Sequence, residues 1–330
     1  VGHVLCHDMT QIIKDQYKDA RFRKGHVVTE EDIPVLLSMG KEHLYVWEMT
    51  SGMVHENDAA ERLLALCGQE NMIRSGVKEG KIELKAACDG VFLVDSARLV
   101  AVNSQDEVMI ATRKGGMAVR EGDKLAGMRV IPLIIEEEKL RKAEQAAGDK
   151  PLLSLKPYVR KTACIVATGG EVKKGLIKDT FTPVVIDKLK TYGIETLEVV
   201  YSGDGVENVR DAVLAMRERN PDMVLCTGGM SVDPDDNTPS GIRAAGADIV
   251  CYGAPVLPGA MFLLGYFDDG MPVMGLPGCV MYAGATVFDL VLPKIAADVP
   301  VTRADLAALG EGGLCLGCKP CHYPICPFGK

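Results

Sequence analysis

The stretch TACIVATGG, from Thr162 to Gly170, decides the fold, because a buried strand runs here directly into a glycine turn. The run DMVLCTGG, from Asp222 to Gly229, repeats this pattern. Between and after these two runs, apolar stretches alternate with segments whose apolar residues have helical spacing. Strands separated by about ten to fifteen helical residues predict a three-layer α/β/α domain, with a mostly parallel sheet and helices on both faces.

The other elements of this domain follow from the same pattern. Further strands are expected at 194–202 and, as a hairpin around Asp269 and Gly270, within 261–278. Helices are expected at 180–193, 206–219, 238–246 and 280–295. In sheets of this type, ligands bind outside the carboxyl ends of the strands. The loops ATGGE, YSGDG, TGGMSVDPDD and GLPGC all follow strands, so we expect them to meet at one edge of the sheet.

Changes in pattern along the chain predict further modules around this domain. Residues 1–80 are expected to form a mixed α/β segment, in which Thr29, with Asp32 three residues later, marks a helix start. Residues 81–157 are expected to form a β-rich module and linker, since short strands are broken by glycine, asparagine and charged residues. The α/β domain then covers residues 158–298, and residues 299–330 form a cysteine-rich tail.

The composition is that of an ordinary soluble globular protein, with 330 residues, 47% hydrophobic residues and 25% charged residues. A net charge of −8 without a basic block argues against nucleic acid or an anionic membrane as a partner. No apolar run approaches the roughly 20 residues of a membrane span, and the first residues show no signal-peptide pattern. Seven of the eleven cysteines are scattered in mostly apolar contexts, as in a reduced compartment, so we expect a cytoplasmic protein.

The loop TGGMSVDPDD, from Thr227 to Asp236, is the main candidate for ligand binding. Gly228 and Gly229 allow the backbone to approach a ligand closely, and their amides, with the hydroxyl of Thr227 or Ser231, can point at an oxygen of phosphate or molybdate. The aspartates that follow would repel such an anion unless a hard cation lay between. Mg²⁺ suits this arrangement, since it binds one or two carboxylates and fills its other positions with phosphate oxygens and water. The alternative is a glycine turn followed by a solvated acidic loop that caps the next helix.

Carboxylates also follow two other strands of the expected sheet. Glu171 follows the strand that begins at Thr162, and Asp204 follows the strand at 194–202. Together with Asp236, they would place three carboxylates at one edge. The turn from Gly275 to Gly278 directly precedes an expected helix, whose N-terminus can hold an anion. The sequence therefore predicts a metal and phosphate site at this edge.

Five blocks of the chain resemble those of a known family. TGGE with IKD, GDG, TGGMSV with Asp236, LPG at Leu257–Gly259 and GLPG at Gly275–Gly278 are similar in order and spacing to the MoeA-type molybdopterin molybdenumtransferases, which are kin to the gephyrin E domain. The resemblance covers about residues 160–297 and implies an α/β molybdopterin-binding domain. Upstream, CDGVF at Cys88–Phe92 looks like the family's Asp-Gly-Tyr-Ala block, which implies a catalytic or metal-proximal role for Asp89. A surface turn would place an aspartate in the same way.

The family's reaction, as the resemblance implies it, is the Mg²⁺-dependent insertion of molybdate into adenylylated molybdopterin with release of AMP, a step of molybdenum cofactor biosynthesis. Catalytic or metal-orienting roles are implied for Glu171, Asp204, Asp236 and Asp89. Binding of the molybdopterin ligand is implied for Thr168, Gly169, Thr227, Gly228, Gly229, Ser231, Pro258, Gly259, Gly275, Leu276, Pro277 and Gly278. The resemblance also implies a homo-oligomer, with a molybdoenzyme or its maturation factors as further partners.

Several positions depart from the family pattern. The family's Lys-Pro-Gly-Lys block reads Leu257 to Ala260 here, so two cations that would meet an anion are absent. Gly-Leu-Pro-Gly continues with Cys279 and Val280, and Phe181 stands where an asparagine often follows the IKD-like block. A charged hydrogen bond contributes roughly 1.5–3 kcal/mol, so a non-catalytic molybdopterin-binding carrier or regulator is the alternative to the transferase. A molybdopterin adenylyltransferase is a third reading, against which the extra N-terminal modules count.

The tail CLGCKPCHYPICPFGK carries Cys315, Cys318, Cys321 and Cys326, spaced C-x2-C-x2-C-x4-C with a proline after the last. Thiolates this close together in a reduced compartment favour a metal over disulfides. The spacing is one residue longer than the ferredoxin-type run, which favours an iron–sulfur cluster. A Zn²⁺ site, with thiolates or His322 as ligands, and an unmetallated tail are the alternatives.

Overall fold

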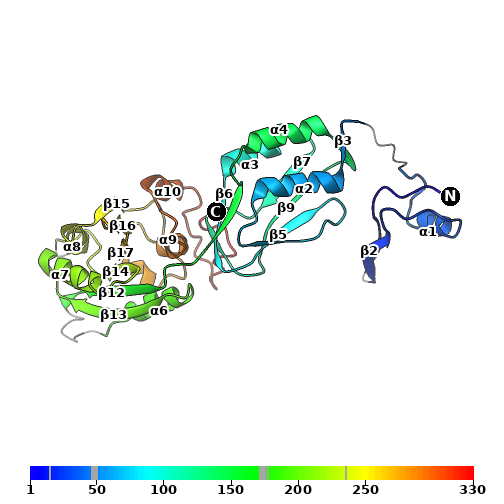
Figure 1. Ribbon diagram of the computed structural model, residues 1–330. Coiled ribbons are helices and arrows are strands. Elements are labelled where there is room, and N and C mark those ends of the chain that lie inside the picture. Colours follow the sequence, from blue (N-terminus) through cyan, green and yellow to red (C-terminus); the bar gives the residue numbers. More distant parts are fainter. Residues whose placement is uncertain (15, 46–50, 171–175, 177, 235) are drawn as a thin grey trace. The chain divides into compact units, whose positions relative to one another are not determined.

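The chain forms two compact units, whose helices and strands are labelled in Figure 1. The computed structural model describes residues 1–14, 16–45, 51–170, 176, 178–234 and 236–330. The first unit comprises Val1–Ala87, Val94–Gly115 and Glu121–Ser154. The second unit comprises Cys88–Leu93, Gly116–Arg120 and Leu155–Lys330.

A six-stranded sheet lies at the centre of the second unit (Figure 1). Its strands are β12 (Thr162–Thr168), β13 (Glu195–Ser202), β14 (Met223–Thr227), β15 (Asp248–Tyr252), β16 (Leu263–Tyr266) and β17 (Pro272–Leu276). They are arranged in the order β13-β12-β14-β17-β16-β15. Strands β12, β13, β14 and β17 are parallel, whereas β16 is antiparallel to both of its neighbours. The mostly parallel sheet is therefore confirmed.

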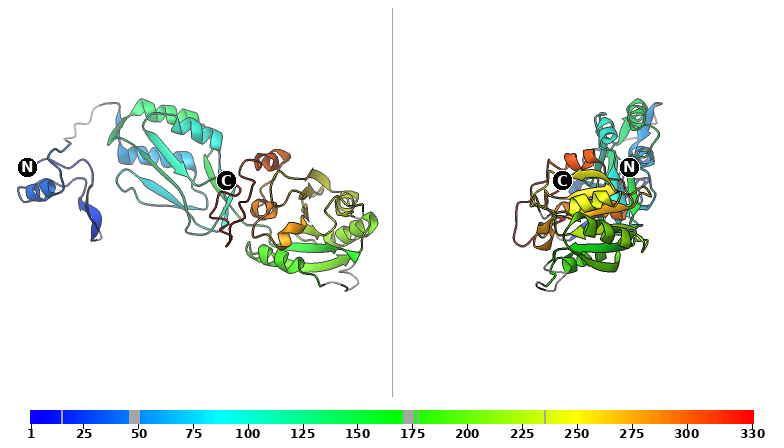
Figure 2. Two further views of the ribbon diagram at one scale, coloured as in Figure 1. Left: turned by 180° about the vertical axis from the view of Figure 1, so that it is seen from behind. Right: turned by 90° about the vertical axis from the view of Figure 1, so that its left-hand side faces the viewer.

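Helices cover both faces of this sheet, as the views of Figures 1 and 2 show. The helices of the unit are α6 (Thr182–Lys190), α7 (Val206–Arg217), α8 (Thr238–Ala244), the 3-10 helix η1 (Gly278–Met281), α9 (Val287–Ala296) and α10 (Arg303–Ala308). Successive residues of β12 alternate between two cores. Ala163 and Ile165 pack with side chains of α6 and α9, whereas Cys164 and Val166 pack with those of α7 and α8. Because both faces of the strand are buried, the run is apolar at nearly every position, and the three-layer fold is confirmed.

Two elements of the sheet unit differ from the sequence-based expectation. The helix expected at 280–295 is split, because η1 ends at Met281 and α9 begins only at Val287. A capping box starts α9, in which the Asp289 carboxylate accepts the Thr286 amide at 2.7 Å. Strand β15 has no counterpart among the expected strands, whereas the hairpin of β16 and β17 is present.

The compact units also divide the chain differently from the expected segments. Strands β6 (Gly90–Val94), β8 (Met117–Val119) and β11 (Leu153–Pro157) form a sheet in the order β11-β6-β8, most of which belongs to the second unit. The hydroxyl of Tyr158 donates to the Gly90 oxygen at 2.9 Å, which holds β6 in that unit. The stretch expected as a linker is thus partly strand β11, and the tail at 299–330 also belongs to the second unit.

The first unit contains a four-stranded antiparallel sheet in the order β4-β5-β9-β7. The strands of the first unit as a whole are β1 (Met9–Ile13), β2 (Tyr17–Phe22), β3 (Met53–His55), β4 (Met72–Arg74), β5 (Ile82–Ala86), β7 (Val108–Thr112), β9 (Lys124–Val130) and β10 (Ile134–Glu136). Its helices are α1 (Asp32–Ser38), α2 (Glu56–Cys67), α3 (Ser96–Asn103) and α4 (Glu137–Ala147). In the described parts of both units, no helix combines the length and the apolar composition that crossing a membrane requires.

Helix α1 begins at Asp32 with Glu31 at its N-cap, so the helix starts three residues later than the expected start at Thr29. The Asp32 carboxylate lies 2.7 Å from Nε2 of His26 and accepts the Thr29 amide at 2.8 Å. These bonds, with that of His26 the largest cause, lower the pKa of Asp32 from 3.8 to about 2. A carboxyl whose folded-state pKa is depressed stabilises the fold at pH values above its unfolded pKa, and this contribution is lost as the pH falls through about 2.

An NMR titration of the Asp32 carboxyl carbon is therefore expected to show a midpoint near pH 2. His26→Ala removes the largest cause, so it should move the midpoint upward towards 3.8. A midpoint that His26→Ala leaves in place would assign the shift to other partners of Asp32.

Candidate ligand-binding site

The carboxyl ends of β12 and β14 lie side by side where the strand order reverses. Strand β13 pairs with one edge of β12 and β14 with the other, and open α/β sheets bind ligands at this point. Ala167 pairs with Thr227, so the loops that follow the two strands come together. The amide of Gly169 donates to the Ser202 oxygen at 3.3 Å, which ties the loop after β12 to the end of β13.

The backbone carbonyl groups that follow β14 are turned towards buried threonines. The Thr168 hydroxyl donates to the Thr227 oxygen at 2.9 Å. The Thr238 hydroxyl donates to the Gly228 oxygen at 2.9 Å, and the Thr238 amide donates to the Gly229 oxygen at 3.1 Å. The two hydroxyl oxygens lie 3.1 Å apart, so the threonines join the ends of both strands into one network.

Tyr252 extends this network from β15. Its hydroxyl donates to the Met230 oxygen at 2.9 Å, and burial, followed by the charge of Asp236, raises its pKa, so it stays a donor at neutral pH. The C=O and N–H groups of a trans peptide point in opposite directions. The peptide groups with the bonded carbonyls of residues 227 to 229 therefore direct the amides of residues 228 to 230 away from the network, whereas the amide of Ser231 donates to Asp236. A row of amides of this kind forms a concavity that attracts an oxyanion.

Glycine is required at two positions of this loop. Gly228 has a φ of +82° and Gly229 a φ of +56°. A Cβ atom on Gly228 would lie 2.3 Å from the Thr168 backbone oxygen, and one on Gly229 would lie 2.7 Å from the Thr238 hydroxyl. Both glycines are half-buried, so they allow the loop to press against β12 and still leave its amide side within reach of a small ligand.

Two of the predicted carboxylates are bonded to the strand-end loops. The Asp236 carboxylate accepts the Ser231 amide at 2.9 Å, and the Asp204 carboxylate accepts the Gly170 amide at 3.1 Å. Each of these bonds uses Oδ2. The other oxygen, Oδ1, is the kind of ligand that Mg²⁺ binds together with phosphate oxygens. Ser231 has its hydroxyl, rather than its amide, to offer a ligand. The predicted Glu171 lies outside the described residues.

The four residues predicted to bind a ligand at the end of β17 differ in their exposure to solvent. Leu276 is fully buried in the core. Gly275 packs on Met230, since a Cβ atom there would lie 2.6 Å from the Met230 sulfur. Pro277 is buried, whereas Gly278 is exposed and a Cβ atom on it would meet no atom within 4 Å. Within this turn Gly278 is thus the glycine that is open to a ligand, and Gly275 has a packing role.

Asp89 lies at the other edge of the sheet. The residue that follows it, Gly90, accepts a hydrogen bond from the hydroxyl of Tyr158 at 2.9 Å. Tyr158 precedes β12, and its ring packs edge-on against that of Tyr192, just before β13, at 5.2 Å. Asp89 therefore lies where these strands begin, and the structure does not bring it to the loops that follow their carboxyl ends.

Pro258 and Gly259 belong to the loop between β15 and β16. A Cβ atom on Gly259 would lie 2.6 Å from Cγ1 of Val287, the first residue of α9. The amide of Leu257 donates to the Gly313 oxygen at 2.8 Å. This loop therefore packs against α9 and the cysteine-rich tail.

The four tail cysteines are free thiols. Cys315 and Cys326 are half-buried, and Cys318 and Cys321 are exposed. In the described ranges, no three side chains of His, Cys, Asp or Glu are grouped so that they could hold a metal ion. The metal site at these cysteines therefore stays a prediction.

Two surface cavities lie away from the strand-end loops. One, of about 710 Å³, is lined by β2 and the start of α1. The other, of about 570 Å³, runs between α6 and the edge strand β13. Neither cavity contains the glycine loops predicted to bind a ligand.

The network includes two residues that sequence reasoning did not single out. Thr238 carried a signal, since it stands directly before Pro239 at the start of α8, where an N-terminal hydroxyl is common. Tyr252 carried none, because it lies on the unexpected strand β15 and reaches the loop only through the folded sheet.

We expect Thr238→Val to destabilise the second unit by about 1–3 kcal/mol, because it leaves the partly buried Gly228 oxygen without its hydroxyl donor. Urea unfolding measures this loss. Thr196→Val is the matched control, since the Thr196 hydroxyl is buried and has no hydrogen-bond partner within the described chain. Equal effects of the two substitutions would show that the Thr238 hydrogen bond contributes nothing.

Two parts of the chain match known protein families. Residues 164–297 match the family described as "Probable molybdopterin binding domain". Residues 1–48 match a second family, described as "Domain of unknown function (DUF8806)".

Individual relatives are more distant. A CinA-like protein of Mycobacterium tuberculosis is 32% identical over 76 residues, which are 23% of this chain and 18% of that protein. A CinA-like protein of Petrotoga mobilis is 29% identical over 89 residues, 27% of this chain and 22% of that protein. The chain thus spans about a fifth of the length of these curated relatives.

The chain also has low sequence identity to solved structures. CinA of Thermoplasma acidophilum, described as of unknown function, has 19% identity and a TM-score of 0.37 over 41% of this chain and 98% of its own. The molybdopterin biosynthesis moea protein of Pyrococcus horikosii has 16% identity and a TM-score of 0.34 over 78% of this chain and 82% of its own. Over residues 164–297, the segment that contains the glycine loops of the sheet, this chain is similar to the probable molybdopterin binding domain family.

Proposed function

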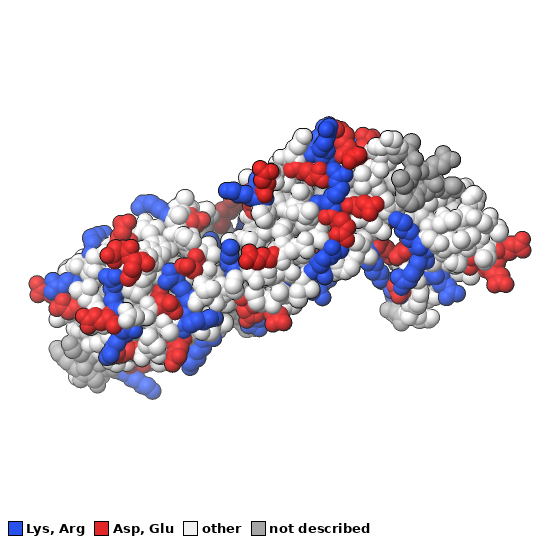
Figure 3. All heavy atoms as spheres, in the orientation of Figure 1, with Lys and Arg blue, Asp and Glu red and all other residues white. Residues whose placement is uncertain are grey.

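We propose that the second unit binds molybdopterin by its phosphate, at the loops after β12 and β14, and that the chain acts in molybdenum cofactor biosynthesis. The row of inward-facing carbonyl groups from Thr227 to Gly229 carries this proposal, because it turns the amides of residues 228 to 230 towards the ligand side. The family match over residues 164–297 supports a pterin as the ligand. Basic and acidic side chains are interspersed on the face drawn in Figure 3, so we assign phosphate binding to backbone amides rather than to a broad basic patch.

The reaction we propose is the Mg²⁺-dependent insertion of molybdate into adenylylated molybdopterin. Asp204 and Asp236 support it, because each is fixed by a backbone amide of a strand-end loop and has a second carboxylate oxygen for a metal. When bound there, Mg²⁺ would screen the phosphate from these carboxylates and polarise its oxygens. The chain's own part is to bind the phosphate with the Gly228 and Gly229 amides and to orient the carboxylates.

A second candidate is a carrier or regulator that binds molybdopterin without turning it over. Leu257 and Ala260 support this alternative, since they stand where the resembled family has lysines. The loop that contains them is also bonded to the tail through Leu257. The two candidates share the pterin site and differ in whether the bound ligand reacts.

One experiment separates them. The full chain is mixed anaerobically with adenylylated molybdopterin, and binding and AMP release are followed with and without molybdate and Mg²⁺. AMP release that requires both additions supports the transferase. Tight binding without release supports the carrier, and the absence of binding overturns both.

For the transferase, Asp236→Asn is expected to lower Mg²⁺-dependent AMP release by about ten- to a hundred-fold, as the loss of a charge-assisted contact predicts. Asparagine can still accept the Ser231 amide, so the unfolding free energy should stay nearly unchanged. Asp233→Asn removes an exposed carboxylate from the same loop and serves as the control. Unchanged turnover in Asp236→Asn would remove this carboxylate from the mechanism.

A further inference from the structure

An open cavity of about 710 Å³ lies between β2 and the start of α1, in the N-terminal part of the first unit (Figure 1). This volume is within the range of sites for small molecules. Strand β2 and the turn after it contribute three cations to the lining, Arg21, Arg23 and Lys24. The start of α1 contributes the carboxylates of Glu31 and Asp32. The cavity therefore combines a cationic side with an acidic one.

A bulge in β2 brings the first of these cations to the cavity. Met9 of β1 pairs with Phe22. The residue after Met9 pairs with Ala20, so Arg21 is an extra residue between the two pairs. In a regular strand neighbouring side chains point to opposite faces, whereas Arg21 and Phe22 both line the cavity. Bulges re-aim side chains in this way and are frequent next to active sites.

The turn after β2 is held by backbone hydrogen bonds. The amide of Lys24 donates to the Asp8 carboxylate at 2.7 Å, and the amide of His26 donates to the Arg23 oxygen at 3.0 Å. The backbone that carries Arg23 is thus fixed before a ligand binds, which lowers the cost of ordering it on binding. Nζ of Lys24 lies 3.3 Å from Nδ1 of His55. We therefore assign an anionic ligand to the two arginines rather than to the lysine.

The charges that line the cavity are unequally compensated. The Asp32 carboxylate lies 2.7 Å from Nε2 of His26, and this bond offsets part of its negative charge. Within the described ranges of the chain, neither Arg21 nor Arg23 forms an ion pair with a carboxylate, and Arg23 acts on Asp19 through its charge alone. Two guanidinium groups at this cavity can therefore pair with an anion from outside the chain.

Phe22 and Val35 give the cavity an apolar wall. Phe22 is 7% exposed and belongs to a small core, against which Val35 packs. The Phe22 ring also lies 5.2 Å, between centroids, from the half-buried ring of His26. A bare ion would leave most of the volume empty and could not use this wall. Glu31 is exposed at the other side and would repel a second anionic group.

We propose that this cavity binds a small organic phosphate, with the phosphate group on Arg21 and Arg23 and an apolar or aromatic body on Phe22 and Val35. A phosphate ester carries a charge of about −1.5 to −2 at neutral pH, which two guanidinium groups match. The planar guanidinium also binds phosphate oxygens through two parallel N–H bonds. A carboxylate has one charge and would leave one arginine unpaired. This site is separate from the proposed pterin site of the second unit and does not depend on it.

The test uses the full chain and phenyl phosphate, which combines a phosphate group with an aromatic ring. We expect the NMR signals of the Val35 methyl groups and of the Phe22 ring to shift in a saturable way at millimolar concentration, which is ordinary for a ligand of this size. Inorganic phosphate should bind at least about ten-fold more weakly, because it cannot contact the apolar wall. Equal affinity for inorganic phosphate, or the absence of saturable shifts at these two residues, would overturn the proposal.

Variants locate the phosphate group. Arg21→Gln and Arg23→Gln are each expected to weaken the binding of phenyl phosphate about ten- to a hundred-fold, as the loss of a charged hydrogen bond predicts. Both side chains are exposed, so the unfolding free energy should change little. Lys18→Gln removes the same charge from an exposed residue of β2 outside the cavity and should leave the affinity nearly unchanged. Gly228→Ala alters the strand-end loops of the second unit and should leave the shifts of Val35 in place. Weakening by Lys18→Gln as large as that by Arg21→Gln would assign the effect to the general charge of the segment and overturn the site.

Discussion

Gly228→Ala is expected to weaken ligand binding at the strand-end loops strongly and to destabilise the second unit by about 2–5 kcal/mol. Two effects add. A residue other than glycine at a φ of +82° costs roughly 1–2 kcal/mol. The new Cβ atom would also lie 2.3 Å from the Thr168 backbone oxygen, and relieving an overpacked contact of this kind costs typically about 1–3 kcal/mol.

Relief of the clash has a consequence for the site. The Thr168 oxygen belongs to the backbone at the end of β12 and cannot rotate away, so the loop after β14 has to move. That movement breaks the alignment of the carbonyl groups with Thr168 and Thr238, and it misdirects the amides that would meet the phosphate. We therefore expect molybdopterin binding to weaken by at least about a hundred-fold, more than the stability loss alone would cause.

Gly270→Ala is a matched control for the backbone strain. Gly270 has a φ of +80°, and a Cβ atom there would meet no atom within 4 Å. It lies in the turn between β16 and β17, so this variant isolates the cost of the left-handed conformation and should bind the ligand normally. Urea unfolding and ligand titration of both variants measure the difference. Equal stability and equal affinity would mean that the close approach to Thr168 has no role.

The main sheet could be predicted because its signal is local. Every residue from Ala163 to Ala167 is buried, and a short apolar run between turn residues is the pattern of a strand covered on both faces. The glycine pair at Gly228 and Gly229 could also be predicted as a close-approach loop, because positive φ values select glycine.

The start of α9 could have been predicted from the sequence, but the apolar pattern around it favoured a longer helix. The apolar run through Val280 and Val287 suggested one continuous helix. Thr286 and Asp289 instead form a capping box, which starts the helix at Val287 and leaves the residues before it to η1 and a loop. A threonine with an acidic residue three positions later is visible without a structure.

The rest of the site depends on contacts between distant parts of the chain. Thr168 and Thr238 meet across 70 positions of sequence, because the register of β12 with β14 decides which side chains face the loop. The position of Asp89 also depends on contacts between distant parts of the chain. Its block resembles a family motif, but the pairing of β6 with β8 and the contact of Gly90 with Tyr158 carry it to the opposite edge of the sheet.

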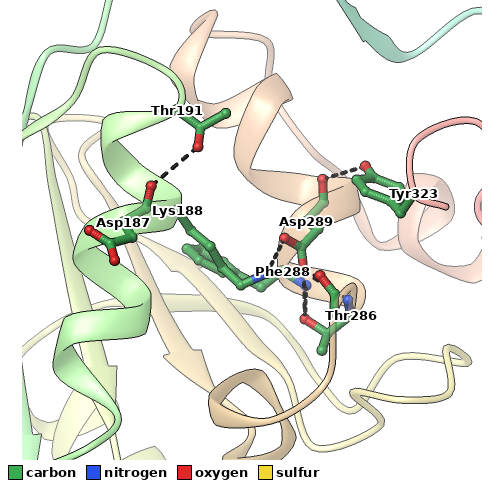
Figure 4. Close-up of polar contacts among 8 residues, drawn as sticks. Asp187, Lys188, Thr191, Thr286, Phe288, Asp289 and Tyr323 are labelled. Carbon is green, nitrogen blue, oxygen red and sulfur yellow. Dashed lines mark hydrogen bonds and ion pairs between the residues drawn. The ribbon is translucent and has the colours of Figure 1, made fainter. Parts of the chain in front are cut away.

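Lys188→Met is expected to destabilise the second unit by about 3–5 kcal/mol, because it leaves a buried carboxylate without its cation. Nζ of Lys188 on α6 lies 2.5 Å from Oδ1 of Asp289 on α9, and the two side chains are only 16% and 11% exposed (Figure 4). The low exposure of both side chains leaves little water at the pair, and burial, followed by the charge of Asp289, raises the pKa of neighbouring Tyr192 to about 12. In such surroundings an unpaired charge is far more costly than at the surface.

The double variant Lys188→Met with Asp289→Asn tests the cause of this loss. Asparagine removes the charge and can still accept the Thr286 amide, which Asp289 accepts at 2.7 Å in the capping box. The bond from Tyr323 reaches the backbone oxygen of residue 289, so the substitution does not remove it. If the penalty in Lys188→Met comes from the unpaired carboxylate, the double variant should regain most of the lost stability in urea unfolding. Neutralising Asp289 cannot restore the packing of the lysine's aliphatic chain between α6 and α9. A double variant as unstable as the single one would therefore mean that Lys188 contributes through this packing.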